Sequence, residues 1–440
     1  MTQAESSPEI GHRQVWHLAG PMILSNLSVP LLGMVDTAIM GQLPEAYYLG
    51  AVAVGSVVFG FLFMAMNFLR MGTTGLIAQV FGRGDHNEMR TGLIQGCGLA
   101  LLLAFFMLML QQPIAWAFFQ IMEGSPEVVT HAREYFDVRI WSGPATLVNF
   151  VLIGWFLGMQ NARGPLYIML LINGTNIVLD FIFVMGLGMD VAGVALASVI
   201  AEYSGLALGL FLVQRELRKY PGEWRLVDIK DIPRIKRMMT LNRDIFLRTL
   251  ALFFAFAFFT RQGASQGDVI LAANAVLMNF FSIMAYGLDG FAHAAEALVG
   301  RSIGERDQRK FDRTIYLSSL WCLMTGVLFA LFYIVCGVWI IHLLTDLENV
   351  REAAYMFLPW LIASPILSAG CFLLDGVFIG ASQGRAMRNT MILVLFVFYL
   401  PAWYLLQPFG NHGLWAAFII FLAARTLVMG LAFRRIQFIR

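Results

Sequence analysis

The sequence predicts an all-α polytopic membrane protein with twelve transmembrane helices, arranged as two six-helix bundles. Three observations support this fold class. Of the 440 residues, 59% are hydrophobic and only 13% are charged, whereas a soluble domain usually carries about 25% charged residues. Apolar runs long enough to cross a bilayer recur along the whole chain. The second half of the chain repeats motifs of the first half at a constant offset.

Each predicted span has at least the roughly 20 mostly apolar residues that a membrane-crossing helix needs. In chain order the spans are 15–40, 48–81, 91–120, 131–159, 165–188, 191–214, 240–262, 269–300, 313–342, 352–380, 389–407 and 412–433. The first apolar run is too long for a signal peptide, so we expect it to be retained as a span. The four cysteines lie inside apolar runs without a CxxC motif, which favours packing over a disulfide or zinc site.

The basic residues predict the orientation of the chain. The two termini and the even-numbered connections between spans hold 23 of the 30 lysine and arginine residues. The odd-numbered connections hold only Arg133, Arg261 and Arg351. Because basic residues are enriched in cytoplasmic loops, both termini and the long sixth connection, 215–243, are predicted to be cytoplasmic.

The internal repeat predicts how the spans are grouped. One constant shift along the chain aligns FGRGD (81–85) with IGERD (303–307) and GWFLGMQNAR (154–163) with GVFIGASQGR (376–385). We therefore predict an N-terminal lobe over 1–218, a cytoplasmic linker over 219–238 and a C-terminal lobe over 239–440. Each half has six spans, so the repeat is parallel, with its pseudo-twofold axis along the membrane normal. Two such bundles would leave a cleft between them and provide alternating access by rocking.

Asp36 is a carboxylate inside the first span, in the outer half of the membrane. A charge at mid-bilayer costs roughly 2.5–3.5 kcal/mol on insertion scales, so such acids usually face a bundle interior or cavity. The same span carries Pro21 and Pro30, each of which removes a helix hydrogen bond and favours a kink. We expect this helix to be deformable near a functional acid.

The fifth span carries polar groups that match Asp36 in depth. Asn173, Asn176 and Asp180 are spaced three and four residues apart, which places them on one helix face. Two carboxylates at similar depth with amides beside them can share a proton or coordinate a small cation such as Na⁺ at Asp36, Asn176 and Asp180. The alternative is structural: Asp36 stabilises a kink, and Asp180 satisfies backbone groups of a neighbouring helix. Glu202, near the middle of the sixth span, could join this cluster or pair elsewhere.

A second polar cluster is predicted in the C-terminal half. Its residues form a stripe at helical spacing along the eighth span, joined by an acid on the tenth span: Ser282, Tyr286, Asp289, His293, Glu296 and Asp375. The stripe could be a cavity wall that attracts cations or a second proton site, since histidine titrates near neutral pH. It could equally be an internal hydrogen-bond network that rigidifies the bundle.

The whole chain resembles the multidrug and toxic compound extrusion (MATE) transporters, and in particular their DinF-type branch. The resemblance rests on these segments: WHLAGPMILSNLSVPLLGMVDTAIMG, FLRMGTTGLIAQVFG, LINGTNIVLDFIFVMGLGM, GLDGFAHAAEALVGRSIG and LLDGVFIGASQGRAMRN. It implies export of amphipathic organic cations and drugs in exchange for protons or sodium. It places Asp36 on the family's first-span acid, and Asn176 and Asp180 on its fifth-span pair.

The resemblance also suggests roles for other residues. Ser198 occupies a position where relatives can have a threonine hydroxyl, and Pro21 matches a proline whose helix bends when the first-lobe site is protonated. One departure concerns the ion. Some relatives have a glutamate after an LFF triplet in the seventh span, whereas here Leu252–Phe254 is followed by Ala255. This difference argues against a second-lobe sodium site and favours protons.

The sequence therefore predicts a proton-coupled multidrug antiporter of the bacterial cytoplasmic (inner) membrane. We expect a monomer without a cofactor or a resident metal, whose partners are small amphipathic cationic drugs and lipid but not nucleic acid. One alternative is a lipid-linked oligosaccharide flippase of the same superfamily, which would favour a more cationic cavity. An intramembrane enzyme is a further alternative, but the HExxH motif of metalloproteases does not occur.

Overall fold

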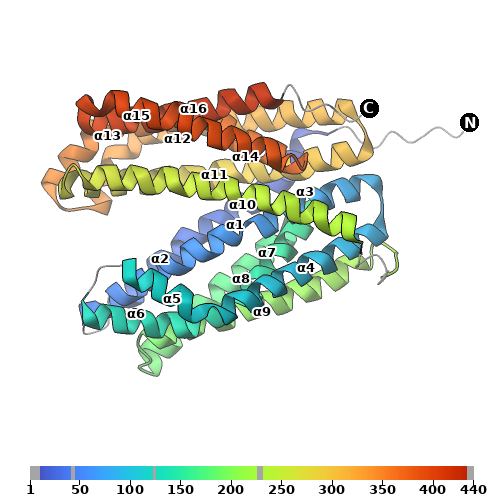
Figure 1. The fold of residues 1–440 in the computed structure, drawn as a ribbon, viewed down its shortest axis with the longest axis horizontal. Coiled ribbons are helices and arrows are strands. Elements are labelled where there is room, and N and C mark those ends of the chain that lie inside the picture. The colour runs from blue at the N-terminus through green and yellow to red at the C-terminus, as the bar shows by residue number, and fades with distance from the viewer. Residues whose placement is uncertain (1–9, 41–44, 122–124, 225–230, 434–440) are drawn as a thin grey trace, which may run out of the picture. The chain divides into compact units, whose positions relative to one another are not determined.

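The computed structural model describes residues 10–40, 45–121, 125–224 and 231–433. Six helical residues are described by their backbone only: Leu31, Met34, Asp36, Thr37, Ala38 and Ala46. Throughout these described ranges the regular structure is helical, and no strand occurs in them (Figure 1). This confirms the all-α fold that the composition predicts.

Sixteen α-helices follow one another along these ranges. Their bounds are α1 (His12–Met40), α2 (Ala46–Met66), α3 (Phe68–Arg83), α4 (His86–Met109), α5 (Gln111–Ile121), α6 (Pro126–Arg139), α7 (Gly143–Gly158), α8 (Arg163–Asp180), α9 (Val191–Leu217), α10 (Ile232–Ala264), α11 (Asp268–Glu305), α12 (Gln308–Leu344), α13 (Glu348–Gly380), α14 (Gly384–Leu393), α15 (Leu400–Leu406) and α16 (Gly410–Phe433). Two π-helical segments, η2 (Phe181–Gly186) and η4 (Val394–Tyr399), and two 3-10 turns, η1 (Ile140–Ser142) and η5 (Gln407–Phe409), join some of them.

These helices contain the predicted spans. Nine helical segments of the described chain are long and apolar enough to cross a membrane. One of them, Gly384–Phe433, contains both of the last two predicted spans, which are separated by a turn at Gly410 with a φ of 57°. The first and seventh predicted spans coincide with α1 and α10. The second span is divided, because α2 ends at Met66 and α3 begins at Phe68.

Large apolar side chains cover much of the helical surface. Val335, Leu405 and Leu343 are 79%, 72% and 70% exposed, and many leucine, phenylalanine and valine side chains on the long helices are similarly open. A soluble monomer rarely exposes large contiguous apolar patches. In a bilayer these side chains face hydrocarbon, so the surface agrees with a multi-pass membrane protein.

The chain divides into two compact units. One comprises the chain up to Ile23 together with the chain from Met239 onward, and the other runs from Leu24 to Met238. The first part of α1 therefore belongs to the unit built mainly from the second half of the chain. There Trp16 packs edge-on against Phe291 and Trp321, with ring centroids 5.2 and 5.1 Å apart. The lobe boundaries drawn from the sequence stay predictions.

The internal repeat is visible in backbone contacts within each unit. A Cβ atom built on Gly158 of α7 would lie 2.9 Å from the backbone nitrogen of Ala78 on α3. A Cβ on Gly380 of α13 would lie 3.0 Å from the backbone nitrogen of Gly300 on α11. The shift that defines the repeat takes both members of the first contact to those of the second. The helix crossings α3–α7 and α11–α13 are thus equivalent close approaches, which small residues permit.

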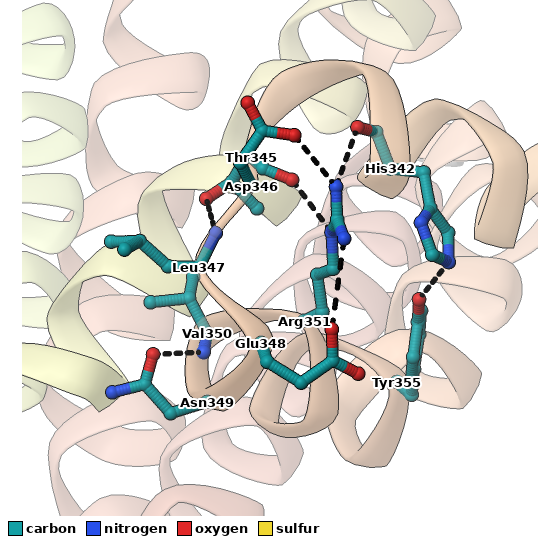
Figure 2. Close-up of polar contacts among 9 residues, drawn as sticks. All are labelled: His342, Thr345, Asp346, Leu347, Glu348, Asn349, Val350, Arg351 and Tyr355. Atoms are coloured by element: carbon teal, nitrogen blue, oxygen red, sulfur yellow. Dashed lines mark hydrogen bonds and ion pairs between the residues drawn. The ribbon is translucent and has the colours of Figure 1, made fainter.

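The connection between α12 and α13 explains one of the few basic residues in the odd-numbered connections. Arg351 donates hydrogen bonds to the carbonyl oxygens of Thr345 (2.7 Å) and His342 (3.2 Å) and pairs with Asp346 at 2.9 Å and Glu348 at 3.6 Å (Figure 2). The last carbonyl groups of a helix have no partner within the helix. Arg351 satisfies one of these in α12, the carbonyl of His342, as well as that of the C-cap residue Thr345, and ties the turn to α13.

Candidate functional site

α8 places the predicted polar residues of the fifth span in the protein interior. Asn173, Asn176 and Asp180 are buried, and Asp180 is 0% exposed. Leu171 and Val178 on the same helix are exposed. The helix is therefore amphipathic in the sense of a membrane span, with its polar face directed inward.

Hydrogen bonds connect this face of α8 to two other helices. Asn176 Nδ2 donates to Ser198 Oγ on α9 at 3.2 Å, so two residues that the sequence analysis assigned to one site do meet. Asn173 Nδ2 donates to Ser28 Oγ on α1 at 2.6 Å. These bonds join α1, α8 and α9 within the unit Leu24–Met238.

Asp36 belongs to α1, but its side chain lies outside the described residues. The backbone around it has a clear setting. Ile39 and Met40, in the last turn of α1, belong to one hydrophobic cluster with Val184 of η2 and Val191 and Val194 of α9. The end of α1 therefore shares a core with the segments that directly follow Asp180.

The two prolines of α1 do not end the helix, which runs without interruption from His12 to Met40. Pro21 lies in the part of α1 that belongs to the unit containing the chain's second half, and Pro30 in the part that belongs to the other unit. Each proline removes one backbone donor from the helix.

A cavity of about 220 Å³ lies beside this polar face, within the unit Leu24–Met238. Five helices contribute to its wall, namely α1, α2, α7, α8 and α9, together with Arg139 at the end of α6. Two of the predicted site residues, Asn176 and Ser198, line this cavity. An ion or ligand site requires such a position. Val29, Leu32 and Phe63 make part of its wall apolar.

Three further residues of the cavity form a polar network that the sequence analysis missed or left open. Asn149 Nδ2 donates to Glu202 Oε2 and to the Glu202 carbonyl oxygen, both at 3.0 Å. Arg139 Nη2 lies 3.9 Å from Glu202 Oε1. The sequence signal for Asn149 is a lone amide within an apolar run, which a search for acids does not select.

Two amide oxygens of the cavity wall have no hydrogen-bond donor. Asn149 Oδ1 and Asn176 Oδ1 are buried, and neither accepts a hydrogen bond from the described part of the chain. A buried carbonyl oxygen without a partner costs roughly 1–3 kcal/mol. Carbonyl oxygens are also ligands for small hard cations. The wall can therefore receive a donor, such as a protonated group, or a cation.

The second predicted cluster lies in the other unit. His293 Nδ1 is 3.6 Å from Glu296 Oε2 on α11, and both residues are buried. Tyr286 and Asp289, further toward the start of the same helix, are half-buried. Four residues of the predicted stripe are thus buried or half-buried on α11, with one contact between an acid and a base, whereas Ser282 is exposed.

Asp375 on α13 is held by two arginines that the sequence analysis did not single out. Asp375 Oδ2 accepts a hydrogen bond from Arg425 Nη2 of α16 at 2.7 Å and another from Arg248 Nη2 of α10. Asp289 interacts electrostatically with both guanidinium groups. Two acids and two bases from four helices therefore form one cluster, in which Asp375 and both arginines are buried and Asp289 is half-buried. The sequence signal for Arg248 and Arg425 is an arginine within a predicted membrane span.

Comparison with known proteins identifies the fold and the family. A family model described as MatE matches residues 21–182 and 245–405. The DNA damage-inducible protein F of Escherichia coli (strain K12) is 43% identical over 437 residues, covering 96% of this chain and 92% of that protein. The probable multidrug resistance protein NorM of Rhizobium meliloti (strain 1021) is 26% identical over 465 residues, covering 99% and 96%. A solved structure of MATE in the bent conformation has a TM-score of 0.88 at 21% identity, covering 96% and 94%.

These matches define the class first: the chain has the fold of an α-helical membrane transporter with twelve spans in two bundles. The chain belongs to the MATE family, and it resembles the DinF protein over nearly its whole length. The family consists of transporters rather than enzymes, so the resemblance stated from the sequence motifs is confirmed and the intramembrane enzyme is excluded.

Proposed function

We propose that the protein is a secondary active multidrug transporter, which exports amphipathic organic cations in exchange for protons. Relatives named as multidrug resistance proteins support the substrate class. The observation that carries the coupling site is the buried polar wall of α8 and α9. There Asn176 and Ser198 line a cavity, and Asp180 lies one turn further along α8 with no exposed surface.

The proposed coupling step is protonation of Asp36 and Asp180 from the outer side. A carboxyl group that gains a proton loses its charge and becomes a hydrogen-bond donor. It then no longer needs the polar partners that hold the ionised form, and α1 can bend at Pro21 or Pro30. The bend would reshape the cavity of the first half and release the drug outward. Rocking of the two bundles would then let the proton leave inside.

Energy conservation limits the stoichiometry. Exchange of one monovalent cation for one proton moves no net charge, so only the pH gradient drives it. One pH unit is equivalent to about 1.4 kcal/mol, or a tenfold drug gradient. A second proton would make the exchange sensitive to membrane voltage, at about 2.3 kcal/mol per 100 mV. His293 and Glu296 on α11 are candidates for that second site.

The proposal for protons rather than sodium rests on residue chemistry. Ala255 follows the triplet Leu252–Phe254, so α10 offers no carboxylate at that position for a second-lobe sodium site. The oxygen-rich wall of the first-half cavity keeps sodium at Asp36, Asn176 and Asp180 as the competing assignment, because Na⁺ also prefers oxygen ligands.

We place the protein in the bacterial cytoplasmic membrane as a monomer, with both termini and the 219–238 linker inside. The support is the distribution of basic residues, 23 of 30 of which lie in the termini and the even-numbered connections.

The test is dye efflux from proteoliposomes with pH and sodium gradients imposed separately. We expect efflux to follow the pH gradient in the wild type, and to fall to the background of protein-free vesicles in Asp36→Asn. The amide cannot take up and release a proton, yet it preserves the size of the side chain. Asp346→Asn, which changes an exposed acid in the α12–α13 connection, serves as the matched control. Wild-type efflux in Asp36→Asn, or efflux that follows sodium at fixed pH, would contradict the proposal.

A further inference from the structure

A second cavity in the unit Leu24–Met238 is not used by the transport mechanism proposed above. It has a volume of about 250 Å³ and lies between the α3–α4 hairpin and the first two turns of α10. The hairpin turn contains Gly84, whose φ of 70° suits glycine, and α4 begins directly after Asp85. The hairpin and the start of α10 both belong to connections that the positive-inside rule places on the cytoplasmic face.

Among the residues that the structure describes, three arginines and one glutamate line this cavity. Glu88 Oε2 pairs with Arg83 Nη2 at 2.7 Å, and Glu88 Oε1 pairs with Arg234 Nη2 at 3.0 Å. Arg237 Nη2 donates to Gln79 Oε1 at 3.3 Å and has no ion pair with an acid in the described ranges. Three guanidinium groups and one carboxylate leave the lining with a formal charge of +2.

Two acids close to the lining residues in sequence, Asp85 and Asp231, do not correct this imbalance; Asp231 Oδ1 accepts the backbone N–H of Arg234 at 3.3 Å and does not line the cavity. Asp85 is the N-cap residue of α4, and its Oδ1 accepts the backbone N–H of Glu88 at 2.8 Å. An N-cap carboxylate is directed toward the helix terminus, where it satisfies an otherwise unpaired donor. Asp85 does not line the cavity.

The equivalent position of the second half carries less positive charge, and its central ion pair is reversed. The shift that defines the repeat takes Arg83 to Glu305 and Glu88 to Lys310, which pair with each other at 2.6 Å. Arg301 adds a second contact to Glu305 at 2.7 Å, and Asp307 lies 3.9 Å from Lys310. Asp307 is the N-cap residue of α12, as Asp85 is of α4. On the same count, two bases, Arg301 and Lys310, face one acid there. The first half therefore has the larger excess of positive charge, because Arg234 and Arg237 of α10 add to it.

The lining suggests the chemistry of a ligand. Guanidinium groups bind phosphate oxygens through paired, charge-assisted hydrogen bonds. Leu76, Val80 and Met238 add an apolar wall to the same cavity. Basic pockets between transmembrane helices on the cytoplasmic side bind anionic lipid headgroups. We propose that this cavity binds the phosphate group of an anionic ligand, which Arg83, Arg234 and Arg237 hold. The phosphate would come from a phospholipid headgroup or a soluble phosphate ester.

The experiment is a binding titration on the full-length protein in a non-ionic detergent. The probes are dihexanoyl phosphatidylglycerol, dihexanoyl phosphatidylcholine and glycerol 3-phosphate. Calorimetry measures the binding of each probe at low and at high salt. We expect phosphatidylglycerol to bind more tightly than phosphatidylcholine, and more weakly as salt rises. If glycerol 3-phosphate binds as well, the phosphate alone suffices. If it does not, the ligand is the lipid.

Two substitutions of opposite sign separate a binding site from a structural clamp. Arg237→Gln should weaken phosphatidylglycerol binding roughly tenfold or more, because it removes a charged hydrogen-bond donor. Glu88→Gln should strengthen binding several-fold, because it releases Arg83 and Arg234 from their internal anion. Lys236→Gln is the matched control, since it removes a charge from the neighbouring position without lining the cavity.

The unfolding temperature of each variant without ligand is measured first, so that a folding defect is recognised. Equal binding of the two lipids would overturn the proposal. Two other results would also overturn it. One is that Glu88→Gln weakens phosphatidylglycerol binding as much as Arg237→Gln does. The other is that Arg237→Gln and Lys236→Gln change phosphatidylglycerol binding equally. The assay measures binding and not transport, so it is independent of the proton-coupling proposal.

Discussion

At the scale of single residues, Asp375 shows how a charge can be both deeply buried and structural. Asp375, Arg248 and Arg425 are 8%, 6% and 3% exposed. Removing several charges from water costs several kcal/mol per ion, which only close pairing can offset. The two guanidinium groups bind the same carboxylate oxygen, Oδ2, and Asp289 adds a second negative charge nearby. The cluster is therefore sensitive to the loss of any one member.

We predict that Asp375→Asn destabilises the protein by about 3 kcal/mol, because it leaves two buried guanidinium groups without their carboxylate. The measurement is thermal unfolding in detergent at one scan rate. Asp346→Asn also removes an acid that pairs with an arginine, but its side chain is fully exposed and its effect should be undetectable. Equal unfolding temperatures of the two variants would show that the buried cluster contributes nothing.

The proposed protonation in the first half and the ion pairing seen in the second would give acids of the same type different tasks. Asp180 lies on a cavity-lining face beside amide groups, whereas Asp375 is held by two bases. Burial alone does not distinguish them. The two acids differ in the groups that contact each carboxylate.

At the scale of helices, close backbone approach organises each unit. A Cβ on Gly154 would collide with the carbonyl oxygen of Arg70, and a Cβ on Gly376 would collide with that of Ala292. These two pairs are again related by the internal repeat. Because the obstructing atoms are backbone, no side-chain rotation can make room for a methyl group.

We predict that Gly154→Ala and Gly376→Ala each destabilise the protein by about 1–3 kcal/mol through overpacking. Gly98→Ala is the control, since it lies within α4 with no atom within 4 Å of the added Cβ. Alanine favours helix over glycine, so the control should be neutral or slightly stabilising. Thermal unfolding checks all three variants. A stable Gly154→Ala variant would mean that α3 and α7 do not cross as closely as described.

At the scale of the whole molecule, the repeat conserves packing while charge diverges. The glycine contacts of α3–α7 recur in α11–α13, yet the pair Arg83–Glu88 is reversed as Glu305–Lys310. Asp36 likewise has no acidic counterpart, since the shifted position is Phe258. Packing preserves a scaffold that both halves need. The polar chemistry can then differ between the halves, as a coupling site in one of them requires.

The orientation of the molecule gives a prediction that labelling can check. In a variant without native cysteines, Leu347→Cys should react with an impermeant maleimide added to intact cells, because Leu347 is 63% exposed in an odd-numbered connection. Glu223→Cys, in the sixth connection, should react only after the cells are opened. The reverse pattern would contradict the positive-inside assignment.

The sequence predicts the helices, and it predicts some of the polar residues that lie in the interior of the two units. It selected Asp180, Asn176 and Asp375 because charged and amide groups are expensive in a membrane. It missed Asn149, Arg139, Arg248 and Arg425, whose importance depends on which helix face meets which neighbour. The periodicity of one helix shows a face, but it does not show the residue across from that face.

The sequence by itself determined the class of protein, the number of spans, their predicted orientation and the internal repeat. These four properties depend on hydropathy, charge and local spacing, which follow directly from the order of residues in the sequence. Only the tertiary structure decided that Asn176 meets Ser198, that Asp375 is held by two arginines, and that three arginines surround a cavity beside α10. Such pairings join residues that are far apart in the sequence, as for Arg248 and Asp375, and packing of helix against helix selects them.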